Sequence, residues 1–277
     1  MENINRYYPN FEREPLDDEY KKNGLCICKK CNTPRQFLHD WNGKKIVFNC
    51  ECECQKAERE AHEKAEKELE LRNKIEGLKQ IGIPNPTYRG YTIDKDDRKT
   101  PSLTKIIKNY IENFEDFSEN GQGLILWGSV GTGKTFYAMC IANALCENLK
   151  RVYCTSLSAV VKMAQDFDNA EAHFSRLLSQ DLIIVDDLGA ERGTTFAMEQ
   201  IYGFIDGCNT YKIPLVITTN LTPSVLEKAS QDTADLTYAR IYSRILEKCY
   251  PVKVNEIKRR ENNAQSNKIE MAKLLGV

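Results

Sequence analysis

The residues with the clearest chemical meaning are Gly128–Thr135, which read GSVGTGKT. They fit the phosphate-loop pattern of glycine, four residues, glycine, lysine, then serine or threonine. The glycines allow a tight turn in which backbone N–H groups converge on phosphate oxygens. Lys134 can reach the β- and γ-phosphates of a nucleoside triphosphate, and the Thr135 hydroxyl can bind Mg²⁺. The residues that we expect to form this site are Gly128, Ser129, Val130, Gly131, Thr132, Gly133, Lys134, Thr135 and Phe136.

The surroundings of this loop favour a phosphate site over a chance glycine-rich turn. The apolar run Leu124–Trp127 predicts a buried strand before the loop, and Phe136–Leu149 predicts a helix after it. This strand–loop–helix order is the context that the pattern requires. The positive end of the helix would then face the bound phosphates.

A pair of carboxylates follows a second predicted strand. Leu182–Val185 is apolar and ends in Asp186 and Asp187. The carboxyl ends of buried parallel strands are where such sheets bind ligands. We expect Asp186 to hold the Mg²⁺ shell through water and Asp187 to orient or deprotonate the attacking water, with Glu191 as a substitute for Asp187. Two solvated aspartates after a buried strand are the plainer alternative.

An amide and two arginines complete the candidate catalytic set. The apolar run Leu215–Thr219 ends in Asn220, whose amide can hold the attacking water or sense the γ-phosphate. Arg240 and Arg244 are four residues apart, so they share one face of a predicted helix. That face could project a guanidinium into the nucleotide of a neighbouring subunit. A helix with two solvated arginines is the alternative.

A cysteine-rich segment near the N-terminus predicts a metal site. Cys28 and Cys31 form a C-x₂-C knuckle, and a second cysteine group follows the Asn42-Gly43 turn and a predicted strand at residues 45–49. Four thiolates at about 2.3 Å would complete the tetrahedral site of a small zinc ribbon. An iron–sulfur cluster also uses four cysteines and stays open. Our choice of ligands is Cys28, Cys31, Cys50 and Cys52, with Cys54 able to replace one of the last pair and Cys26 the weakest candidate.

The rest of the chain indicates how these groups are positioned. Apolar runs predict strands near 123–127, 151–155, 182–186, 215–219 and 250–254, with helices between them. This alternation predicts an α/β fold with a parallel five-stranded sheet and helices on both faces. Residues 55–80 are rich in Glu, Lys and Ala and predict an exposed helix, either a connector or a partner-binding element. The predicted parts are an N-terminal arm, a zinc-binding module, a helical linker and a nucleotide-binding domain, at residues 1–22, 23–55, 56–84 and 85–277.

Composition excludes several classes of protein. Charged residues make up 29% of the chain, and its formal net charge is −1, so any DNA contact must come from a local patch. No apolar run approaches the roughly 20 residues that span a bilayer, and the acidic N-terminus lacks an apolar signal core. The 11 cysteines are an odd number. We therefore expect a cytoplasmic protein without membrane contact, with metal rather than disulfides at the clustered cysteines.

Together these motifs resemble those of the AAA+ ATPases, specifically the DnaC/DnaI-type helicase loaders of bacteria and phages and their IstB-like relatives. The resemblance covers about residues 80–260 and rests on GSVGTGKT, LIIVDDLGAE, VITTN and the RIYSRI helix. It implies that Gly128–Thr135 bind ATP and Mg²⁺, that Asp186 and Asp187 form the acidic motif, and that Asn220 is the first sensor.

The resemblance also implies roles for the arginines and a slow enzyme. Arg244 is the first choice for the arginine finger, Arg240 is the second, and Arg259 is the choice for the second sensor, although the glycine that loaders often place before it is missing. Asp187 stands where most AAA+ enzymes carry glutamate, so its shorter reach implies slow hydrolysis of ATP to ADP and phosphate. Only residues 255–277 follow the last predicted strand, so we expect no C-terminal helical lid.

In the family, an insertion in the sheet contacts single-stranded DNA, and the matching region here is 156–180. It carries basic and aromatic side chains that can pair with phosphates and stack on bases, namely Lys162, His173, Phe174 and Arg176. The basic tail 258–273 is a second candidate, although a solvated chain end explains it equally well.

The resemblance implies an ATP-dependent loader, encoded by a phage or mobile element, that places a replicative hexameric helicase on single-stranded DNA at the start of replication. The cysteine module would hold the helicase, and the ATPase domain would self-associate when ATP is bound. One alternative is an IstB-like ATPase that delivers a transposase to DNA. The other is a zinc-dependent adaptor whose nucleotide site only fixes its shape.

Overall fold

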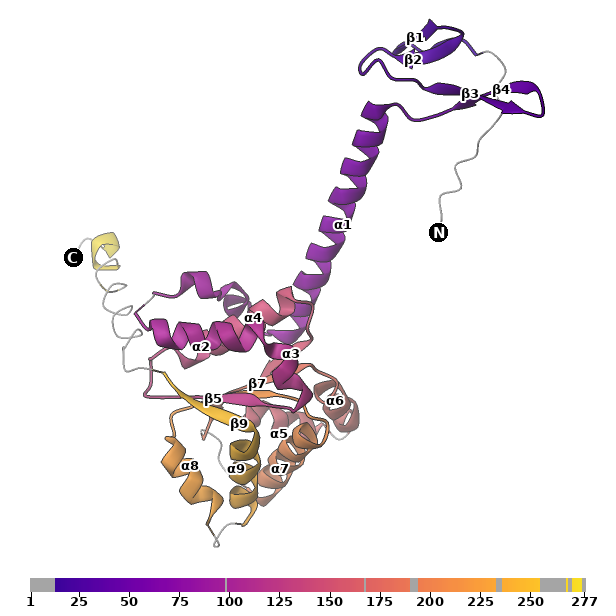
Figure 1. The fold of residues 1–277 in the computed structure, drawn as a ribbon. Helices are drawn as coiled ribbons and strands as arrows, with labels where there is room; N and C mark the ends of the chain where they lie inside the picture. The colour runs from indigo at the N-terminus through magenta and orange to yellow at the C-terminus, as the bar shows by residue number, and fades with distance from the viewer. Residues whose placement is uncertain are drawn as a thin grey trace. The chain divides into compact units, whose positions relative to one another are not determined.

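Two units, divided between Asn73 and Lys74, make up the chain (Figure 1). The computed structural model describes residues 13–97, 99–166, 168–189, 194–232, 236–254, 268 and 271–275. The division falls inside the long helix that the sequence predicts at residues 55–80. Each unit has its own sheets, and the two are described separately.

The N-terminal unit contains two antiparallel hairpins. Their turns are Asn-Gly pairs, at Asn23-Gly24 and Asn42-Gly43, and all four residues have positive φ. Two-residue turns with this backbone match the twist of the strands they join, which explains why the short hairpins form. The strands are β1 (Glu19–Lys22), β2 (Leu25–Cys28), β3 (Gln36–Trp41) and β4 (Lys44–Asn49), with β1 paired to β2 and β3 to β4.

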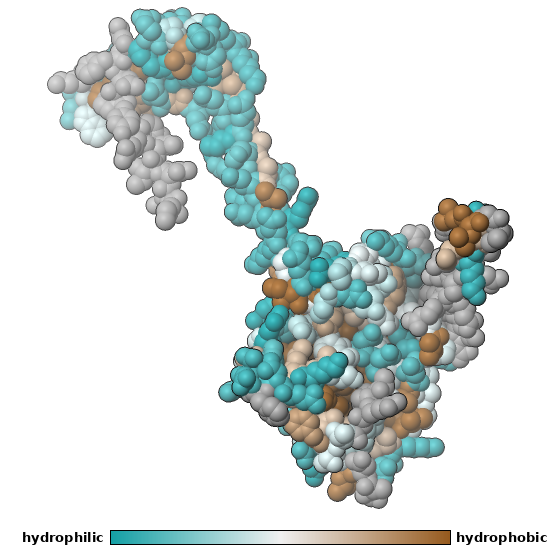
Figure 2. Space-filling model, turned by 180° about the vertical axis from the view of Figure 1, so that it is seen from behind, coloured by the Kyte–Doolittle hydropathy of each residue, from teal (hydrophilic) through white to brown (hydrophobic). Residues whose placement is uncertain are grey.

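The helix α1 (Glu53–Gly82) follows β4 and has 30 residues. Its surface is exposed along most of its length, and Figure 2 shows it mostly in hydrophilic colours. Its last turns belong to the second unit. There, Lys79 Nζ lies 2.9 Å from Glu147 Oε1, and Gly82 is buried.

The second unit is built on a five-stranded sheet in which every pairing is parallel. Its order is β6-β7-β8-β5-β9. The strands are β5 (Gly123–Trp127), β6 (Val152–Thr155), β7 (Leu182–Leu188), β8 (Leu215–Thr219) and β9 (Cys249–Lys253). The order places β8 between β5 and β7, so the carboxyl ends of these three strands meet at one edge of the sheet.

Helices cover both faces of this sheet (Figure 1). Successive residues of a strand point to opposite faces, so Leu124 and Leu126 join one core and Ile125 joins the other. The first core contains α2, α3 and α4, and the second contains α5, α7 and α9. The helices are η1 (Pro86–Gly90), η2 (Ile93–Lys95), α2 (Pro101–Glu112), α3 (Phe114–Glu119), α4 (Lys134–Glu147), α5 (Leu157–Gln165), α6 (Ala170–Leu177), α7 (Thr195–Thr210), α8 (Pro223–Ser230) and α9 (Leu236–Lys248).

Within the described ranges, no helix is both long and apolar enough to cross a lipid bilayer.

Candidate nucleotide site and cysteine cluster

The phosphate loop connects β5 to α4. Gly131 and Gly133 have φ values of 82° and 101°, in the left-handed region that glycine adopts without steric cost. A Cβ on Gly128 would lie 2.6 Å from the carbonyl oxygen of Val254, so this position needs glycine for space. Gly133 precedes the first turn of α4. The glycines thus bring a backbone turn and a helix N-terminus together, which suits an anionic phosphate.

The ammonium group of Lys134 is held inside this loop. Lys134 is only 7% exposed, and its Nζ donates to the carbonyl oxygens of Gly128 at 2.9 Å and Ser129 at 2.8 Å. It also donates to Oδ1 of Asn220 at 2.7 Å. These three acceptors are neutral oxygens, and they orient the ammonium within the loop. Lys134 and Asn220, 86 residues apart in the chain, are therefore in direct contact.

The acidic pair lies beside the loop at the end of β7. Thr135 Oγ1 donates to Asp186 Oδ1 at 2.9 Å, and Thr218 Oγ1 donates to the same oxygen at 2.6 Å. The backbone N–H of Asp187 donates to Thr218 Oγ1 at 2.9 Å. The pairing of β7 with β8 shifts register between Val185 and Leu188, and Asp187 has a φ of 64°. This irregularity re-aims the two carboxylates at the sheet edge.

A pocket of about 700 Å³ lies beside the loop, and its lining does not include Asp186. The size fits a small organic ligand. Asp187 and Asn220 line it together with Lys134, Thr135 and Phe136 of α4. The other lining residues are Tyr88, Tyr91, Lys95, Asp96, Asp97, Lys99, Val130, Gly131 and Gly133.

Aromatic rings form a wall of this pocket: Phe136 is an expected site residue, whereas Tyr88 and Tyr91 were not predicted. The ring centroids of Tyr88 and Tyr91 are 5.4 Å apart, as are those of Tyr91 and Phe136. Asn143 of α4 holds this segment, because its Nδ2 donates to the carbonyl oxygens of Tyr88 at 2.8 Å and Tyr91 at 3.0 Å. The signal in the sequence was the Tyr-x₂-Tyr spacing just after the proline-rich boundary at residues 83–87.

In the N-terminal unit, the sulfur atoms of Cys28, Cys31, Cys52 and Cys54 all lie within 4.8 Å of one another. A tetrahedral zinc ion with 2.3 Å bonds would separate its sulfurs by about 3.8 Å. The sulfurs of Cys28 and Cys54 are 3.6 Å apart and those of Cys52 and Cys54 are 3.2 Å apart, so the cluster fits one such ion. An iron–sulfur cluster would hold its cysteine sulfurs further apart, because more than one iron lies between them.

The cluster contains the sulfur of Cys54, the expected substitute, and not that of Cys50, which was an expected ligand. Cys50 still belongs to the extended segment after β4: its N–H donates to the Arg35 carbonyl oxygen at 2.8 Å, and its Sγ lies 3.5 Å from the Pro34 carbonyl oxygen. Because α1 begins at Glu53, the chain turns there and returns the Cys54 sulfur to that of Cys52. The sequence predicts that the helix begins at Gln55, two residues later, so this turn was not expected.

Hydrogen bonds shift the pKa values of two thiols of the cluster in opposite directions. The pKa of the Cys31 thiol is lowered to about 5, mainly by a hydrogen bond with the Thr33 hydroxyl, which lies 3.0 Å from Cys31 Sγ. The pKa of the Cys54 thiol is raised to about 12, mainly by its hydrogen bond with Cys52. A bound dication would favour the thiolate form of all four. The cysteines of the second unit are instead buried, and burial raises the pKa of Cys140, Cys146, Cys154, Cys208 and Cys249.

The sequence model of the family described as "IstB-like ATP binding protein" matches residues 93–267. The chain belongs to this family. The matched range contains the phosphate loop, the acidic pair, Asn220 and the α9 arginines, which are the motifs on which the expected resemblance rested.

Similar proteins place the chain beside the helicase loaders. It is 23% identical to the replicative helicase loader DnaI of Bacillus subtilis (strain 168) over 208 residues, which are 70% of this chain and 66% of that protein. The match therefore spans just under two thirds of the relative.

A crystal structure of DnaI has a TM-score of 0.53 at 18% identity, covering 63% of this chain and 93% of that one. A crystal structure of the DnaC helicase loader has a TM-score of 0.51 at 23% identity, covering 62% and 100%. The predicted fold class, an AAA+ α/β domain with a parallel five-stranded sheet after a zinc-ribbon-like module, is thus confirmed. The expected absence of a lid concerns residues 255–277, most of which lie outside the described residues.

The two candidate arginine fingers, Arg244 and Arg240, are not among the residues that line the pocket. Arg244 Nε is 3.3 Å from Asp206 Oδ1, and its Nη1 is 3.6 Å from Glu247 Oε2. Arg240, one turn earlier on α9, is exposed. Arg259 and Glu191 lie outside the described residues. Their roles stay predictions.

In the expected DNA-contacting region, most of the named side chains already have contacts within the chain. His173 Nε2 lies 3.2 Å from Asp166 Oδ2, and the Arg176 guanidinium lies over the Tyr153 ring at 5.6 Å. Phe174 packs against the second core. Lys162 is exposed on α5. DNA contact by this region therefore also stays a prediction.

Proposed function

We propose that this chain binds and hydrolyses ATP with Mg²⁺ and uses the cycle to load a replicative helicase onto single-stranded DNA. The observation that carries the ATPase proposal is the contact of Lys134 with Asn220 beside the Thr135–Asp186 hydrogen bond. Lys134, Thr135 and Asn220 thus line one pocket, and the Asp186 carboxylate is hydrogen-bonded to Thr135.

Each group has a defined task in this proposal. The loop N–H groups and Lys134 bind the phosphates, so the ammonium exchanges protein carbonyls for phosphate oxygens. Thr135 and Asp186 would hold Mg²⁺, which offsets negative charge on the phosphates. Asp187, lining the same pocket, orients the attacking water with Asn220. The aromatic rings of Tyr91 and Phe136 offer an apolar surface for the nucleotide base.

The arginine finger is the part that the single chain leaves incomplete. In this proposal Arg244 acts on the nucleotide of a neighbouring copy, with Arg240 as the second choice. Arg244 pairs with Asp206 within its own chain, so assembly must exchange that contact for the γ-phosphate. The need for a second copy, together with the short Asp187 side chain, supports slow hydrolysis in which ATP acts as a switch.

The loader role rests on similarity and on the two-unit organisation. The relative DnaI is a replicative helicase loader, and the match to it covers 70% of this chain. The four-cysteine cluster has all its positions occupied by protein sulfurs, which is typical of a structural zinc site. We therefore assign helicase binding to the cysteine module and ATP-dependent assembly and DNA engagement to the second unit.

The ATPase proposal is tested with Lys134→Ala and a matched surface control, Lys105→Ala on the exposed side of α2. Loss of the ammonium should weaken ATP binding about 100-fold, since a charge-assisted hydrogen bond contributes ~1.5–3 kcal/mol. Titration with a fluorescent ATP analogue and a phosphate-release assay measure both steps. A Lys134→Ala protein that binds ATP like the control would overturn the proposed site.

The loader proposal is tested by retaining partners from host lysate on tagged protein with ATP or ADP. We expect a replicative helicase in the ATP sample and its loss when Cys28 and Cys31 become serine. Recovery of a transposase instead would support the second candidate, an IstB-like transposition ATPase, which the family match favours. Tight ATP binding without hydrolysis or any effect on DNA would favour the zinc-dependent adaptor.

A further inference from the structure

Arg35 connects the two hairpins of the N-terminal unit through its backbone. Its N–H donates to the Cys26 carbonyl oxygen at 2.9 Å, and its own carbonyl oxygen accepts from the Cys50 N–H at 2.8 Å. Cys26 belongs to β2, and Cys50 follows β4. Backbone hydrogen bonds alone therefore hold Arg35 on both sides, independently of its side chain.

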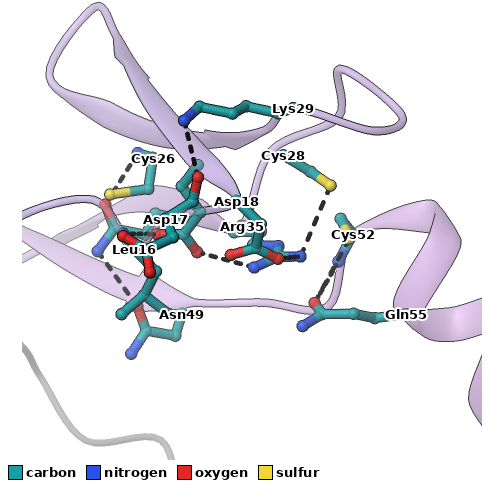
Figure 3. Close-up of polar contacts among 12 residues, drawn as sticks. Leu16, Asp17, Asp18, Cys26, Cys28, Lys29, Arg35, Asn49, Cys52 and Gln55 are labelled. Atoms are coloured by element: carbon teal, nitrogen blue, oxygen red, sulfur yellow. Dashed lines mark hydrogen bonds and ion pairs between the residues drawn. The ribbon is translucent and has the colours of Figure 1, made fainter.

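The side chain of Arg35 then reaches from β1 to the cysteine cluster (Figure 3). It is 7% exposed. Its Nη1 donates to Glu19 Oε1 at 3.2 Å, and its Nη2 donates to Asp18 Oδ2 at 2.6 Å. The same Nη2 lies 3.6 Å from the sulfur of Cys28, within hydrogen-bond reach of a thiolate. One planar guanidinium thus contacts two carboxylates and a cluster sulfur.

Other groups share the two carboxylates that pair with Arg35. Glu19 is shared with Arg13, whose two terminal nitrogens donate to its carboxylate at 2.6 and 2.8 Å. Asp18 has a side chain that is 61% exposed, so water screens it. Four thiolates around a dication carry a net charge of −2, and a buried net charge is costly unless a counter-charge is near.

We infer that Arg35 is a positioning residue of the metal site, which donates to the Cys28 thiolate, offsets the cluster's negative charge and links metal binding to the docking of β1. The inference rests on a metal at the four cysteines but not on ATP hydrolysis. The alternative is a purely structural Arg35 that only pairs with Asp18 and Glu19.

The test uses the full chain with Arg35→Met and Arg35→Lys. The matched control is Arg59→Met, because Arg59 pairs with Glu51 and Glu63 near the cluster but on the exposed surface of α1. Zinc affinity is measured by competition with a chromophoric chelator. As a second measurement, the protein is reconstituted with Co²⁺ and the energy of the sulfur-to-cobalt charge-transfer band is recorded. This energy is sensitive to hydrogen bonds to the ligating sulfurs.

Arg35→Met should lower zinc affinity about 10–100-fold, the usual effect of losing a group that supports a metal ligand. It should also move the charge-transfer band to longer wavelength, because a thiolate without its donor gives up electron density more easily. Arg35→Lys keeps the charge but lacks the planar guanidinium fork that spans the two carboxylates and the sulfur, so it should fall between Arg35→Met and wild type. Arg59→Met should match wild type.

Either of two results overturns the inference. The first is a band energy that stays at the wild-type value in both Arg35 variants, even if their stability falls, because that is the outcome of a purely structural arginine. The second is a wild-type chain that takes up neither zinc nor Co²⁺, which removes the metal site itself. Should Arg35→Met fail to fold, the band and affinity of Arg35→Lys decide between the two roles.

Discussion

At the scale of single residues, Thr218 organises the acidic end of β7. Its hydroxyl donates to Asp186 and accepts from the backbone N–H of Asp187, and the residue is fully buried. One hydroxyl therefore fixes both the carboxylate that we assign to Mg²⁺ and the unusual backbone of the next residue. The VITTN motif contains Thr218, but local sequence does not predict this role, because its partners Asp187 and Asp186 lie 31 and 32 residues away.

Thr218→Val keeps the shape of the side chain but removes the hydroxyl. The N–H of Asp187 and the carboxylate of Asp186 then lose their hydrogen bonds to Thr218, which should lower the free energy of unfolding by ~0.5–1.5 kcal/mol for each bond. Misplacement of Asp186 and Asp187 should also lower kcat about tenfold, equivalent to ~1.4 kcal/mol in activation free energy. Urea denaturation and steady-state ATPase assays measure the two effects.

Thr218→Ser is the matched control, because it restores the hydroxyl without the methyl group. We expect it to recover most of kcat. If Thr218→Val hydrolyses ATP at the wild-type rate while wild type itself is active, the positioning role is wrong and the ATPase proposal still stands.

At the scale of elements, the end of α1 is fixed by a close approach to β6. A Cβ added to Gly82 would lie 2.0 Å from the carbonyl oxygen of Val152, whereas a Cβ on Gly77, in the same helix, meets nothing within 4 Å. The backbone of β6 cannot move away without disturbing its pairing with β7. The helix therefore needs glycine at position 82 and not at position 77.

This pair gives opposite predictions for the same chemical change. Gly82→Ala should destabilise the second unit by at least ~2 kcal/mol through overpacking. Gly77→Ala should stabilise α1 by ~0.5–1 kcal/mol, because alanine loses less backbone entropy in a helix. Thermal unfolding of the two proteins beside wild type checks both signs. Equal melting temperatures would show that the end of α1 can shift to accommodate the added Cβ without loss of stability.

How far the sequence could predict each element depends on how local its signal is. The strands at 123–127 and 215–219 were predicted with the observed bounds, because buried parallel strands are short apolar runs between loops. Cys54 of the four-sulfur cluster was ranked behind Cys50, since the choice depended on where α1 starts. Tyr88 and Tyr91 were missed because Asn143 reaches Tyr88 across 55 residues, a contact that no periodicity encodes.

At the scale of the whole molecule, the chain combines a small unit that has little hydrophobic core with a large unit that has two hydrophobic cores. In the N-terminal unit, large apolar side chains such as Phe37, Leu38 and Trp41 are exposed at 40%, 49% and 62%. Units this small usually need a metal or disulfides to remain folded. The free energy of metal binding should therefore supply most of the stability of this unit, while the second unit should not depend on it.

Metal removal separates these contributions. Treatment of the full chain with a strong zinc chelator should unfold the hairpins, seen as loss of the near-ultraviolet circular dichroism of Trp41, and should abolish helicase retention. The affinity for ATP should stay at its wild-type value, because the pocket is built entirely from residues 88–220.

Cys54→Ser should reproduce the effect of the chelator, whereas Cys50→Ser should retain metal and helicase, since Cys50 lies outside the cluster. Loss of ATP affinity together with zinc would contradict this division, and metal loss in Cys50→Ser would return that cysteine to the ligand set.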